Sequence, residues 1–328
     1  MAEYINIKGQ NIEVVASDPA NPTLGQIWYN STSNTLKGFG YQSDSWATGG
    51  NMGTARYQLA GCGLQTAALA FGGYNAGPTS LTATEEYNGA SWTAGGGLNS
   101  HRRFIGGVGI QTAGLAYGGN NIGSDLASTE EYNGSSWTSV TSMPTARKYL
   151  NPSGGFGIQT SAVVCGGITP GSPTYVTSAL EYDGSSWTSA TAMPQAKAFH
   201  SGSGILTAGF VTGGEGPGTP STLEYDGTNW TSGGNLNTGR SGASGTAGTQ
   251  TAGIYFGGYD GTTTTALTEL YDGTSWSSGT SMSNSRNQAA GSGTKTAALA
   301  YAGVPTPGQV ATEEYTGAGP ATKTITAS

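Results

Sequence analysis

Residues 67–92, AALAFGGYNAGPTSLTATEEYNGASW, hold the pattern that decides the fold. An apolar run ends in two glycines, a variable stretch follows, and the segment closes on Glu-Tyr-Asn-Gly and, after two further residues, a tryptophan. The closing tryptophan recurs at spacings of 46, 45, 50, 43 and 46 residues, at Trp46, Trp92, Trp137, Trp187, Trp230 and Trp276. A period in this range is typical of an array built from one repeated supersecondary unit.

The paired glycines mark the same place in successive repeats. They stand at Gly72-Gly73, Gly118-Gly119, Gly166-Gly167, Gly213-Gly214 and Gly257-Gly258, with Ala302-Gly303 as a degraded sixth pair. One repeat predicts four antiparallel strands, at 56–62, 67–71, 83–87 and from Trp92 onward. We expect the glycine pair to end the second strand, because glycine readily adopts positive φ. We expect Asn88-Gly89 to form a two-residue type I′ turn. Four short strands fill the period and leave no room for helices.

The composition excludes several classes of protein. Glycine accounts for 57 of 328 residues without a Gly-x-y triplet period, which excludes collagen and disfavours long helices. Regularly spaced tryptophans and 17 tyrosines argue against a disordered chain. The net charge is −7 and half of the twelve Lys and Arg hold one repeated position, which does not fit a nucleic-acid binder. Neither a membrane-length apolar run nor a signal peptide is visible, so we expect an all-β protein without membrane insertion or an export route.

The glycine pair, the tyrosine and the tryptophan at these offsets resemble kelch-type β-propeller repeats over residues 41–316. The resemblance implies four-stranded blades around a channel but no particular activity, because propellers host many functions. The last repeat has Pro320 where a tryptophan is expected, and Trp46 has no glycine pair before it. We therefore predict that a strand around Trp46 completes the last blade, which gives six blades without open sheet edges. Seven blades, with residues 25–49 as an incomplete blade, is the alternative.

The first 40 residues lie outside the repeats, so we predict an N-terminal segment at 1–40 and a propeller at 41–328. Residues 25–39 predict a β-hairpin and resemble the G-x-[IL]-W-Y-N…L-K segment of tail-fibre and other structural proteins of tailed bacteriophages. This resemblance implies a virion protein, made in the host cytoplasm without a signal peptide and released by lysis. The segment would then attach the protein to other virion proteins. A homo-oligomer formed through the same segment is a further possibility.

Two functions follow from the phage resemblance. The first is a tail-fibre or receptor-binding module that presents a propeller face to a host glycan or surface protein. The second is a capsid or tail decoration protein in which the propeller is a stable spacer. A propeller enzyme acting on glycans is a distant third alternative.

The chemical inventory argues against catalysis. His101 and His200 occur in non-adjacent repeats, whereas a metal site needs three or four converging ligands. Cys62 and Cys165 stand where other repeats hold ordinary strand residues. A nucleophile elbow, a phosphate-binding loop and a zinc-type cysteine pair are all missing from the sequence. We therefore predict no enzyme, no catalytic residue, no metal site and no cofactor.

A cation stands four residues after the Leu or Met that follows each tryptophan. The six are Arg56, Arg102, Arg147, Lys197, Arg240 and Arg286. Each opens the innermost strand of its blade, which predicts a ring of positive charge around one mouth of the central channel. Two interpretations stay open. The cations bridge backbone carbonyls or the recurring Glu of the third strand, or they bind acidic sugars and other carboxylates at the mouth.

The loops between the second and third strands differ most between repeats. They cover residues 74–82, 120–127, 168–177, 215–220, 259–266 and 304–309. Variable loops on a rigid scaffold are where binding surfaces are usually built. Three tyrosines in these loops are candidates for stacking on sugar rings: Tyr74, Tyr175 and Tyr259.

Overall fold

The computed structural model describes residues 12–325, except 76, 78, 173, 215–218, 244 and 306–309. The described chain is built from strands, which form seven four-stranded sheets. It divides into two compact units: Met1–Asp44 with Gly317–Ser328, and Ser45–Thr316. Parts of the predicted 1–40 segment and of the loops at 215–220 and 304–309 therefore lie outside the described residues.

Six of the seven sheets belong to Ser45–Thr316, and each pairs its strands antiparallel. They are β5 (Ala60–Leu64), β6 (Ala67–Phe71), β7 (Thr84–Tyr87) and β8 (Trp92–Gly95); β9 (Gly106–Ile110), β10 (Ala113–Tyr117), β11 (Thr129–Tyr132) and β12 (Trp137–Val140); β13 (Gly155–Ile158), β14 (Ser161–Cys165), β15 (Ala179–Tyr182) and β16 (Trp187–Ala190); β17 (Ser201–Ile205), β18 (Ala208–Thr212), β19 (Thr222–Tyr225) and β20 (Trp230–Ser232); β21 (Gly245–Thr249), β22 (Ala252–Phe256), β23 (Thr268–Tyr271) and β24 (Trp276–Gly279); and β25 (Ala290–Thr294), β26 (Ala297–Tyr301) and β27 (Thr312–Thr316) with β4 (Ser45–Thr48).

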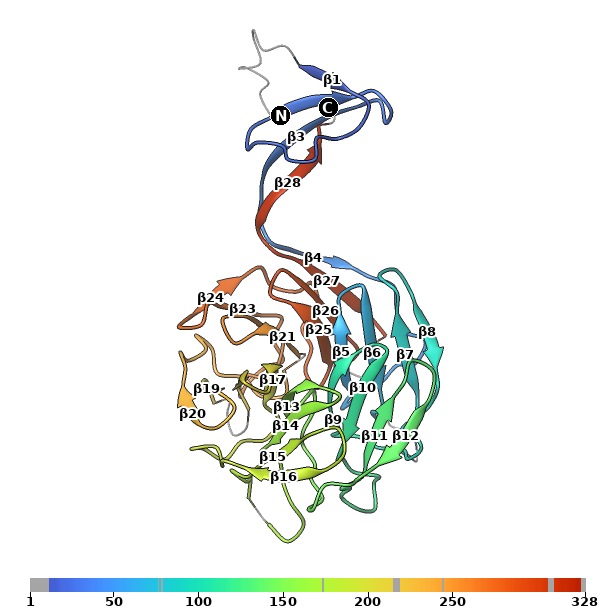
Figure 1. The fold of residues 1–328 in the computed structure, drawn as a ribbon, viewed down its shortest axis with the longest axis vertical. Coiled ribbons are helices and arrows are strands. Elements are labelled where there is room, and N and C mark those ends of the chain that lie inside the picture. Colours follow the sequence, from blue (N-terminus) through green and yellow to red (C-terminus); the bar gives the residue numbers. More distant parts are fainter. Residues whose placement is uncertain are drawn as a thin grey trace. The chain divides into compact units, whose positions relative to one another are not determined.

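The six sheets stand around a common centre (Figure 1). The first strand of each sheet is the innermost one. The innermost strands β5, β9, β13, β17, β21 and β25 contact one another in chain order, and β25 also contacts β5. This radial arrangement of repeated four-stranded sheets is that of a propeller-like fold.

The sheet that contains both ends of the repeat region confirms one prediction. β4 pairs antiparallel with β27, and Trp46 lies opposite Tyr315 as Trp92 lies opposite Tyr87. Trp46 Nε1 also donates a hydrogen bond of 3.1 Å to Thr268 Oγ1 in the neighbouring sheet. The strand around Trp46 therefore completes the last sheet and covers the edge of β27.

The total number of sheets is seven, and the sequence predicted six. The seventh consists of β1 (Glu13–Val15), β2 (Ile27–Asn30), β3 (Thr35–Gln42) and β28 (Gly319–Thr324), with β1 parallel to β2. Its β2–β3 pair confirms the hairpin expected at 25–39.

Strand β28 accounts for the difference from the predicted domain boundaries. Pro320 pairs with Tyr41 of β3, so residues 317–328 belong with the N-terminal segment rather than with the repeats. The alternative of seven blades has the number of sheets right, but its incomplete blade at 25–49 is wrong, because β2 and β3 lie in a complete seventh sheet while β4 lies in another.

The turn between the third and fourth strands is longer than predicted. Tyr87 pairs with Trp92, so four residues form the connection, and only Gly89 of the Asn88-Gly89 pair has positive φ. Asn88 Oδ1 accepts hydrogen bonds from the backbone N–H groups of Ala90 and Ser91. The side chain therefore shapes the turn, and the predicted type I′ geometry is wrong.

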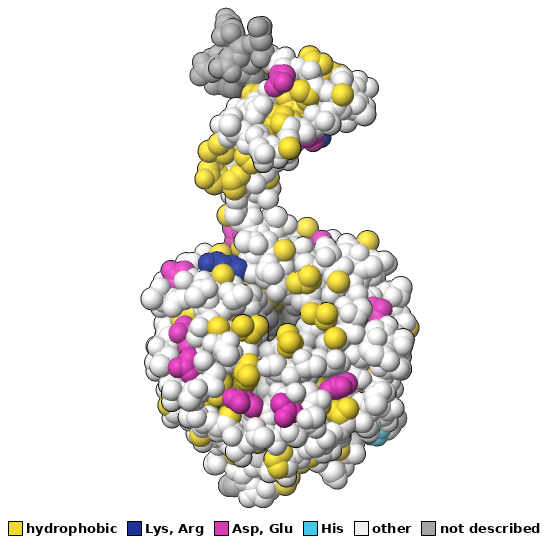
Figure 2. All heavy atoms as spheres, viewed as in Figure 1, with side chains coloured by type: hydrophobic (Ala, Val, Ile, Leu, Met, Phe, Trp, Pro, Cys, Tyr) yellow, Lys and Arg dark blue, Asp and Glu magenta, His cyan; other side chains and the backbone are white. Residues whose placement is uncertain are grey.

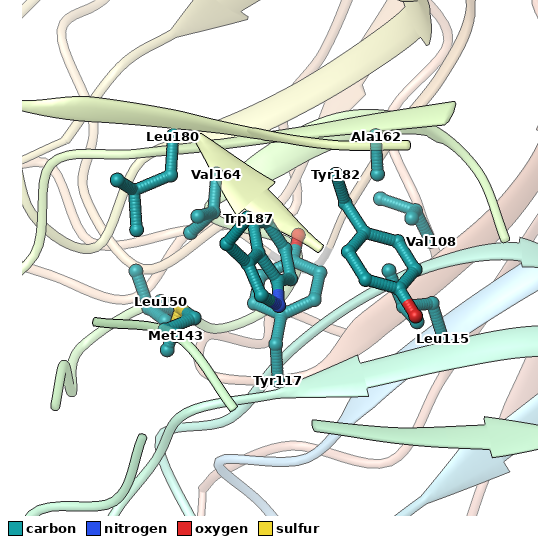
Figure 3. Close-up of a cluster of buried hydrophobic side chains, with 10 residues drawn as sticks. All are labelled: Val108, Leu115, Tyr117, Met143, Leu150, Ala162, Val164, Leu180, Tyr182 and Trp187. Atoms are coloured by element: carbon teal, nitrogen blue, oxygen red, sulfur yellow. The ribbon is translucent and has the colours of Figure 1, made fainter. Parts of the chain in front are cut away.

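Apolar side chains fill the space between neighbouring sheets. Figure 3 shows one such cluster, made of Val108, Leu115, Tyr117, Met143, Leu150, Ala162, Val164, Leu180, Tyr182 and Trp187. Trp187 packs against Tyr182 of its own sheet at a centroid distance of 4.8 Å and against Tyr117 of the preceding sheet at 5.8 Å. The repeated tryptophan is thus a contact between sheets, which explains its period.

Polar bonds between sheets repeat in the same way. The corner after each innermost strand carries a glutamine in four repeats, and Gln111 Nε2 donates to Ala68 O at 3.1 Å and Tyr87 O at 2.7 Å. In the sixth repeat Lys295 Nζ donates to Tyr271 O at 2.8 Å. These corners are therefore committed to holding neighbouring sheets together.

Candidate binding surface

The six repeated cations are buried inside the sheets, with between 0% and 2% of each residue exposed. Arg240 is typical: its Nη1 donates to Gly257 O at 2.7 Å and Leu267 O at 2.8 Å, and its Nη2 forms an ion pair of 2.8 Å with Glu269 Oε1. The guanidinium thus links the end of the second strand to the start of the third.

The other repeats follow this arrangement with one variation. Ion pairs to the third-strand carboxylate join Arg56 to Glu85, Arg102 to Glu130 and Arg286 to Glu313. In the third and fourth repeats a hydroxyl group takes the place of the carboxylate: Arg147 Nη2 donates to Ser178 Oγ at 2.9 Å and Lys197 Nζ to Ser221 Oγ at 2.7 Å.

This geometry favours the first of the two interpretations, in which the cations bridge groups within the sheets. Arg56, Arg102, Arg147, Lys197, Arg240 and Arg286 present no side chain to a channel mouth. Burial lowers the pKa of Arg56 to about 10, although the Glu85 carboxylate acts in the opposite direction. A ligand would have to displace bonds within the sheet to reach these groups, so the structural interpretation describes them.

Two of the candidate tyrosines hold equivalent positions. Tyr74 and Tyr259 each form an isolated bridge with the residue that follows the buried cation, Tyr57 and Ser241 respectively. Tyr259 is 39% exposed. Tyr74 is half-buried, packs edge-on against Tyr57 at 5.5 Å and lies under the Arg103 guanidinium at 4.7 Å.

Tyr175 is half-buried within its loop. Its backbone neighbour Val176 donates a hydrogen bond to Gly167 O at 3.0 Å, which attaches this end of the loop to the glycine pair of its own sheet. Each of the three tyrosines therefore belongs to a different sheet.

A ring of residues with left-handed backbones stands two positions after the buried cations. We call it the inner ring: Gln58 (φ 59°), Phe104 (53°), Tyr149 (61°), Phe199 (53°), Gly242 (55°) and Gln288 (50°). Residues other than glycine rarely adopt positive φ, and such strain clusters where binding or catalysis takes place. Five non-glycine residues in one ring therefore point to a functional surface.

Backbone hydrogen bonds close the inner ring. Five of the six residues donate their backbone N–H to the inner-ring carbonyl of the preceding repeat, at 2.8–3.0 Å. The pairs are Gln58 to Gln288, Phe104 to Gln58, Phe199 to Tyr149, Gly242 to Phe199 and Gln288 to Gly242. In the remaining gap Leu150 N donates to Phe104 O at 3.2 Å. The backbone of the ring is therefore fixed, and its side chains are free to differ.

The inner-ring side chains form an aromatic half and an amide half. Phe104 and Phe199 lie 4.6 Å and 4.5 Å from Tyr149, measured between ring centroids. Opposite them, Gln58 Nε2 donates to Gln288 Oε1 at 2.8 Å. The three aromatic residues are half-buried, so one side of the cluster is accessible.

A pocket of about 280 Å³ lies beside Gly242, where the inner ring has no side chain. Its lining residues are Phe199, Ser241, Gly242, Tyr259, Asn287 and Gln288. Asn287 is 8% exposed, and its Nδ2 donates to Thr264 Oγ1 at 2.7 Å. Asn287 Oδ1 is buried and has no hydrogen-bond partner in the described part of the chain.

Arg103 and Lys148 supply accessible positive charge near the inner ring, and neither belongs to the repeated set of cations. The Arg103 guanidinium lies 5.2 Å from the Phe104 ring. Lys148 pairs with Asp125 at 3.0 Å and lies 5.4 Å from the Tyr149 ring. Both directly follow a buried cation in sequence.

Sequence reasoning missed the inner ring, although a signal for it was present. The cation stays the same from repeat to repeat, while the next two positions change from Tyr-Gln to Arg-Phe and Lys-Tyr. Positions that vary beside a repeated cation are candidates for the surface. The loops were compared between repeats, but these two positions were not.

The innermost strands line a central channel of about 190 Å³. Glycines dominate its wall, and the hydroxyls of Ser203 and Ser292 are bonded to Gly248 O and Cys62 O of neighbouring strands. On the face that Figure 2 displays, hydrophobic side chains gather around the central opening of Ser45–Thr316, and no ring of Lys and Arg surrounds it. The channel wall therefore offers little specific chemistry.

The buried pair of Cys165 and His200 does not form an activated nucleophile. The sulfur lies 3.6 Å from His200 Nε2. Burial raises the pKa of Cys165 to about 12 and lowers the pKa of His200 to about 3, so both groups are neutral at pH 7. Among the described residues, no three His, Cys, Asp or Glu side chains are placed to hold a metal ion. The described chain also contains no helix that could cross a membrane.

A scan of this chain against protein-family models and a search of curated proteins both found no match.

Proposed function

We propose that the sheets of Ser45–Thr316 form a closed propeller of the kelch type, within a bacteriophage virion protein. In this proposal the propeller is a receptor-binding module, and its inner-ring face contacts a ligand on the host surface. The seventh sheet, which contains the phage-like segment at 25–39, attaches the module to other virion proteins.

The observation that carries this proposal is the inner ring. Its backbone is fixed by the bonds between repeats, yet its side chains include the aromatic cluster of Phe104, Tyr149 and Phe199. Left-handed residues, accessible aromatic rings and amide groups on one rigid ring are features of a binding surface. The pocket beside Gly242 belongs to the same ring.

A capsid or tail decoration protein is the second candidate, and one observation favours it. The far ends of the innermost strands carry exposed aliphatic residues, 48–55% accessible, at Leu64, Ile110, Ile158 and Ile205. Exposed apolar residues grouped in this way suit contact with another protein. In a decoration protein these residues, rather than the inner ring, make the essential contact.

Binding to intact cells of a panel of bacterial strains tests the proposal. We compare wild type with the triple variant Phe104→Gly, Tyr149→Gly and Phe199→Gly, which gives three more ring positions the residue found at Gly242. The matched control is the quadruple variant Leu64→Ser, Ile110→Ser, Ile158→Ser and Ile205→Ser. We expect only the triple variant to lose cell binding while keeping its melting temperature.

Electron microscopy of virions with a labelled antibody against the protein shows where the protein lies in the virion. Label at the tail tip supports the receptor-binding module. Label along the capsid, together with cell binding that persists in the triple variant, supports the decoration protein and contradicts our proposal.

A further inference from the structure

The pocket beside Gly242 exists because one inner-ring position lacks a side chain. Gly242 has φ 55°, close to the 53° of Phe104 and Phe199. A Cβ at this glycine would come no closer than 3.6 Å to another atom, Gln288 Cγ. The position therefore has room for the phenylalanine that two other repeats carry at a similar φ, and glycine leaves that space open.

The wall of the pocket combines aromatic rings with the side chain of Asn287. Phe199 and Tyr259 supply aromatic surface, and the Tyr259 hydroxyl donates to Gly261 O at 3.2 Å. Asn287 Nδ2 is bonded to Thr264, which sets the direction of the unpartnered Oδ1. A buried acceptor without a partner favours a ligand that brings a donor.

The lining also excludes charge and large size. The described lining residues are aromatic, hydroxyl, amide or glycine, without a carboxylate or a cation. A volume of about 280 Å³ lies just below the range of roughly 300–1,000 Å³ typical of larger ligands. A neutral ring with hydroxyl donors on one edge and C–H groups on its face matches these properties, because C–H groups favour the negative face of an aromatic ring.

We propose that this pocket binds one neutral sugar ring, with a sugar hydroxyl donating to Asn287 Oδ1 and the sugar face against Phe199 or Tyr259. The inference rests on the proposed function only for the source of the sugar, a glycan of the host surface. It names a neutral ligand, whereas the sequence suggested acidic sugars.

Saturation-transfer NMR on the full chain tests the site directly. The probes are the methyl glycosides of glucose, galactose and N-acetylglucosamine, with methyl glucuronide as the charged comparison. We expect saturation transfer to at least one neutral glycoside at millimolar affinity. Absence of transfer to all three neutral probes, or preference for the glucuronide, would overturn the proposal.

Variants locate the signal. Gly242→Phe fills the pocket with a residue that two other repeats carry at a similar φ, so we expect it to fold with a slightly lower melting temperature and to lose the neutral glycoside. Asn287→Ala removes the acceptor, and we expect about tenfold weaker binding. The control Ile158→Ser lies outside the inner ring and outside the pocket lining, so we expect it to keep the signal. Unchanged glycoside binding in Gly242→Phe would contradict the inference.

Cell binding separates this inference from the proposed function. Glycoside binding that Gly242→Phe abolishes, in a protein that binds no cells, supports the pocket and contradicts the receptor-binding role. Cell binding that depends on the inner-ring aromatic residues, in a protein that binds no glycoside, contradicts the pocket and supports the role.

Discussion

At the scale of single residues, the repeated Thr-Glu-Glu-Tyr sequence is a set of four separate contacts. Thr84 accepts from Trp137 Nε1 at 2.9 Å, and Glu85 pairs with the buried arginine of its own sheet. Glu86 accepts from the Tyr132 hydroxyl at 2.5 Å. Tyr87 in turn donates to Glu314 of the sheet before it. The sequence repeats because each residue has its own partner.

The buried cations that pair with a carboxylate should lose more stability on substitution by alanine than those that do not. Arg240→Ala leaves the Glu269 carboxylate buried without its cation, so we expect a loss of about 3–5 kcal/mol in the free energy of unfolding. Lys197→Ala is the matched control, because the hydrogen bonds described for Lys197 go to two backbone carbonyls and a hydroxyl. There we expect about 1–3 kcal/mol. Urea denaturation measures both. Equal losses, or recovery of Arg240→Ala by an acidic oligosaccharide, would contradict this account.

Sequence identified the cation position but could not show its burial. Charge at a fixed offset is visible in the letters, whereas the enclosing carbonyls come from Gly257 and Leu267, which are distant in sequence from Arg240. The inner ring escaped prediction for a similar reason. Its left-handed backbone depends on bonds to other repeats, and the residues themselves, such as Phe104 and Tyr149, are not typical of that conformation.

At the scale of elements, the repeated side chains mainly form hydrogen bonds from one sheet to its neighbour. Tryptophan, tyrosine and the corner glutamine of one repeat each reach the previous sheet, as Trp137, Tyr132 and Gln111 do. The period therefore predicted the strands well, because it is the period of these contacts. The turn at 88–91 was mispredicted because the Asn88 side chain, rather than two left-handed residues, shapes it.

The tyrosine contacts between sheets predict sensitivity to alkali. Burial, with the Glu86 carboxylate as a further cause, raises the pKa of Tyr132 to about 12 from 10.0. Since the folded pKa lies above the unfolded one, this contribution to stability is complete below pH 10 and is lost as the pH rises toward 12. We expect the stability advantage of wild type over Tyr132→Phe to be constant up to about pH 10 and to shrink from there toward about pH 12, measured by urea denaturation. An advantage that stays constant or grows above pH 10 would contradict this pKa shift.

At the scale of the whole molecule, the pairing of the strand around Trp46 with the last repeat was readable from the sequence, and the seventh sheet was not. The last repeat has Pro320 where a tryptophan is expected, and Trp46 has no glycine pair before it. Together they indicated that the strand around Trp46 completes the last sheet, as it does. Nothing in the repeat pattern showed that residues 319–324 pair with 37–42, because β28 follows no repeat period.

Truncations test this division. The fragment Ser45–Thr316 keeps β4, so we expect cooperative thermal melting close to that of the full chain. A fragment of residues 51–316 lacks β4 and leaves the edge of β27 unpaired, and we expect aggregation or a much lower melting temperature. Circular dichroism and light scattering follow both. Equal melting of the two fragments would show that β4 does not hold the ring closed.

The pairing of β4 with β27 has a mechanical consequence. The chain passes between the two compact units twice, from Asp44 to Ser45 and from Thr316 to Gly317, and Ser45 and Thr316 are paired with each other. Tension applied through the seventh sheet is therefore shared by two covalent connections. Both pull on the same end of one strand pair, so neither strand is driven to slide along the other. Because the chain is attached through both β4 and β27, this strand pair can carry tension without shear between its two strands.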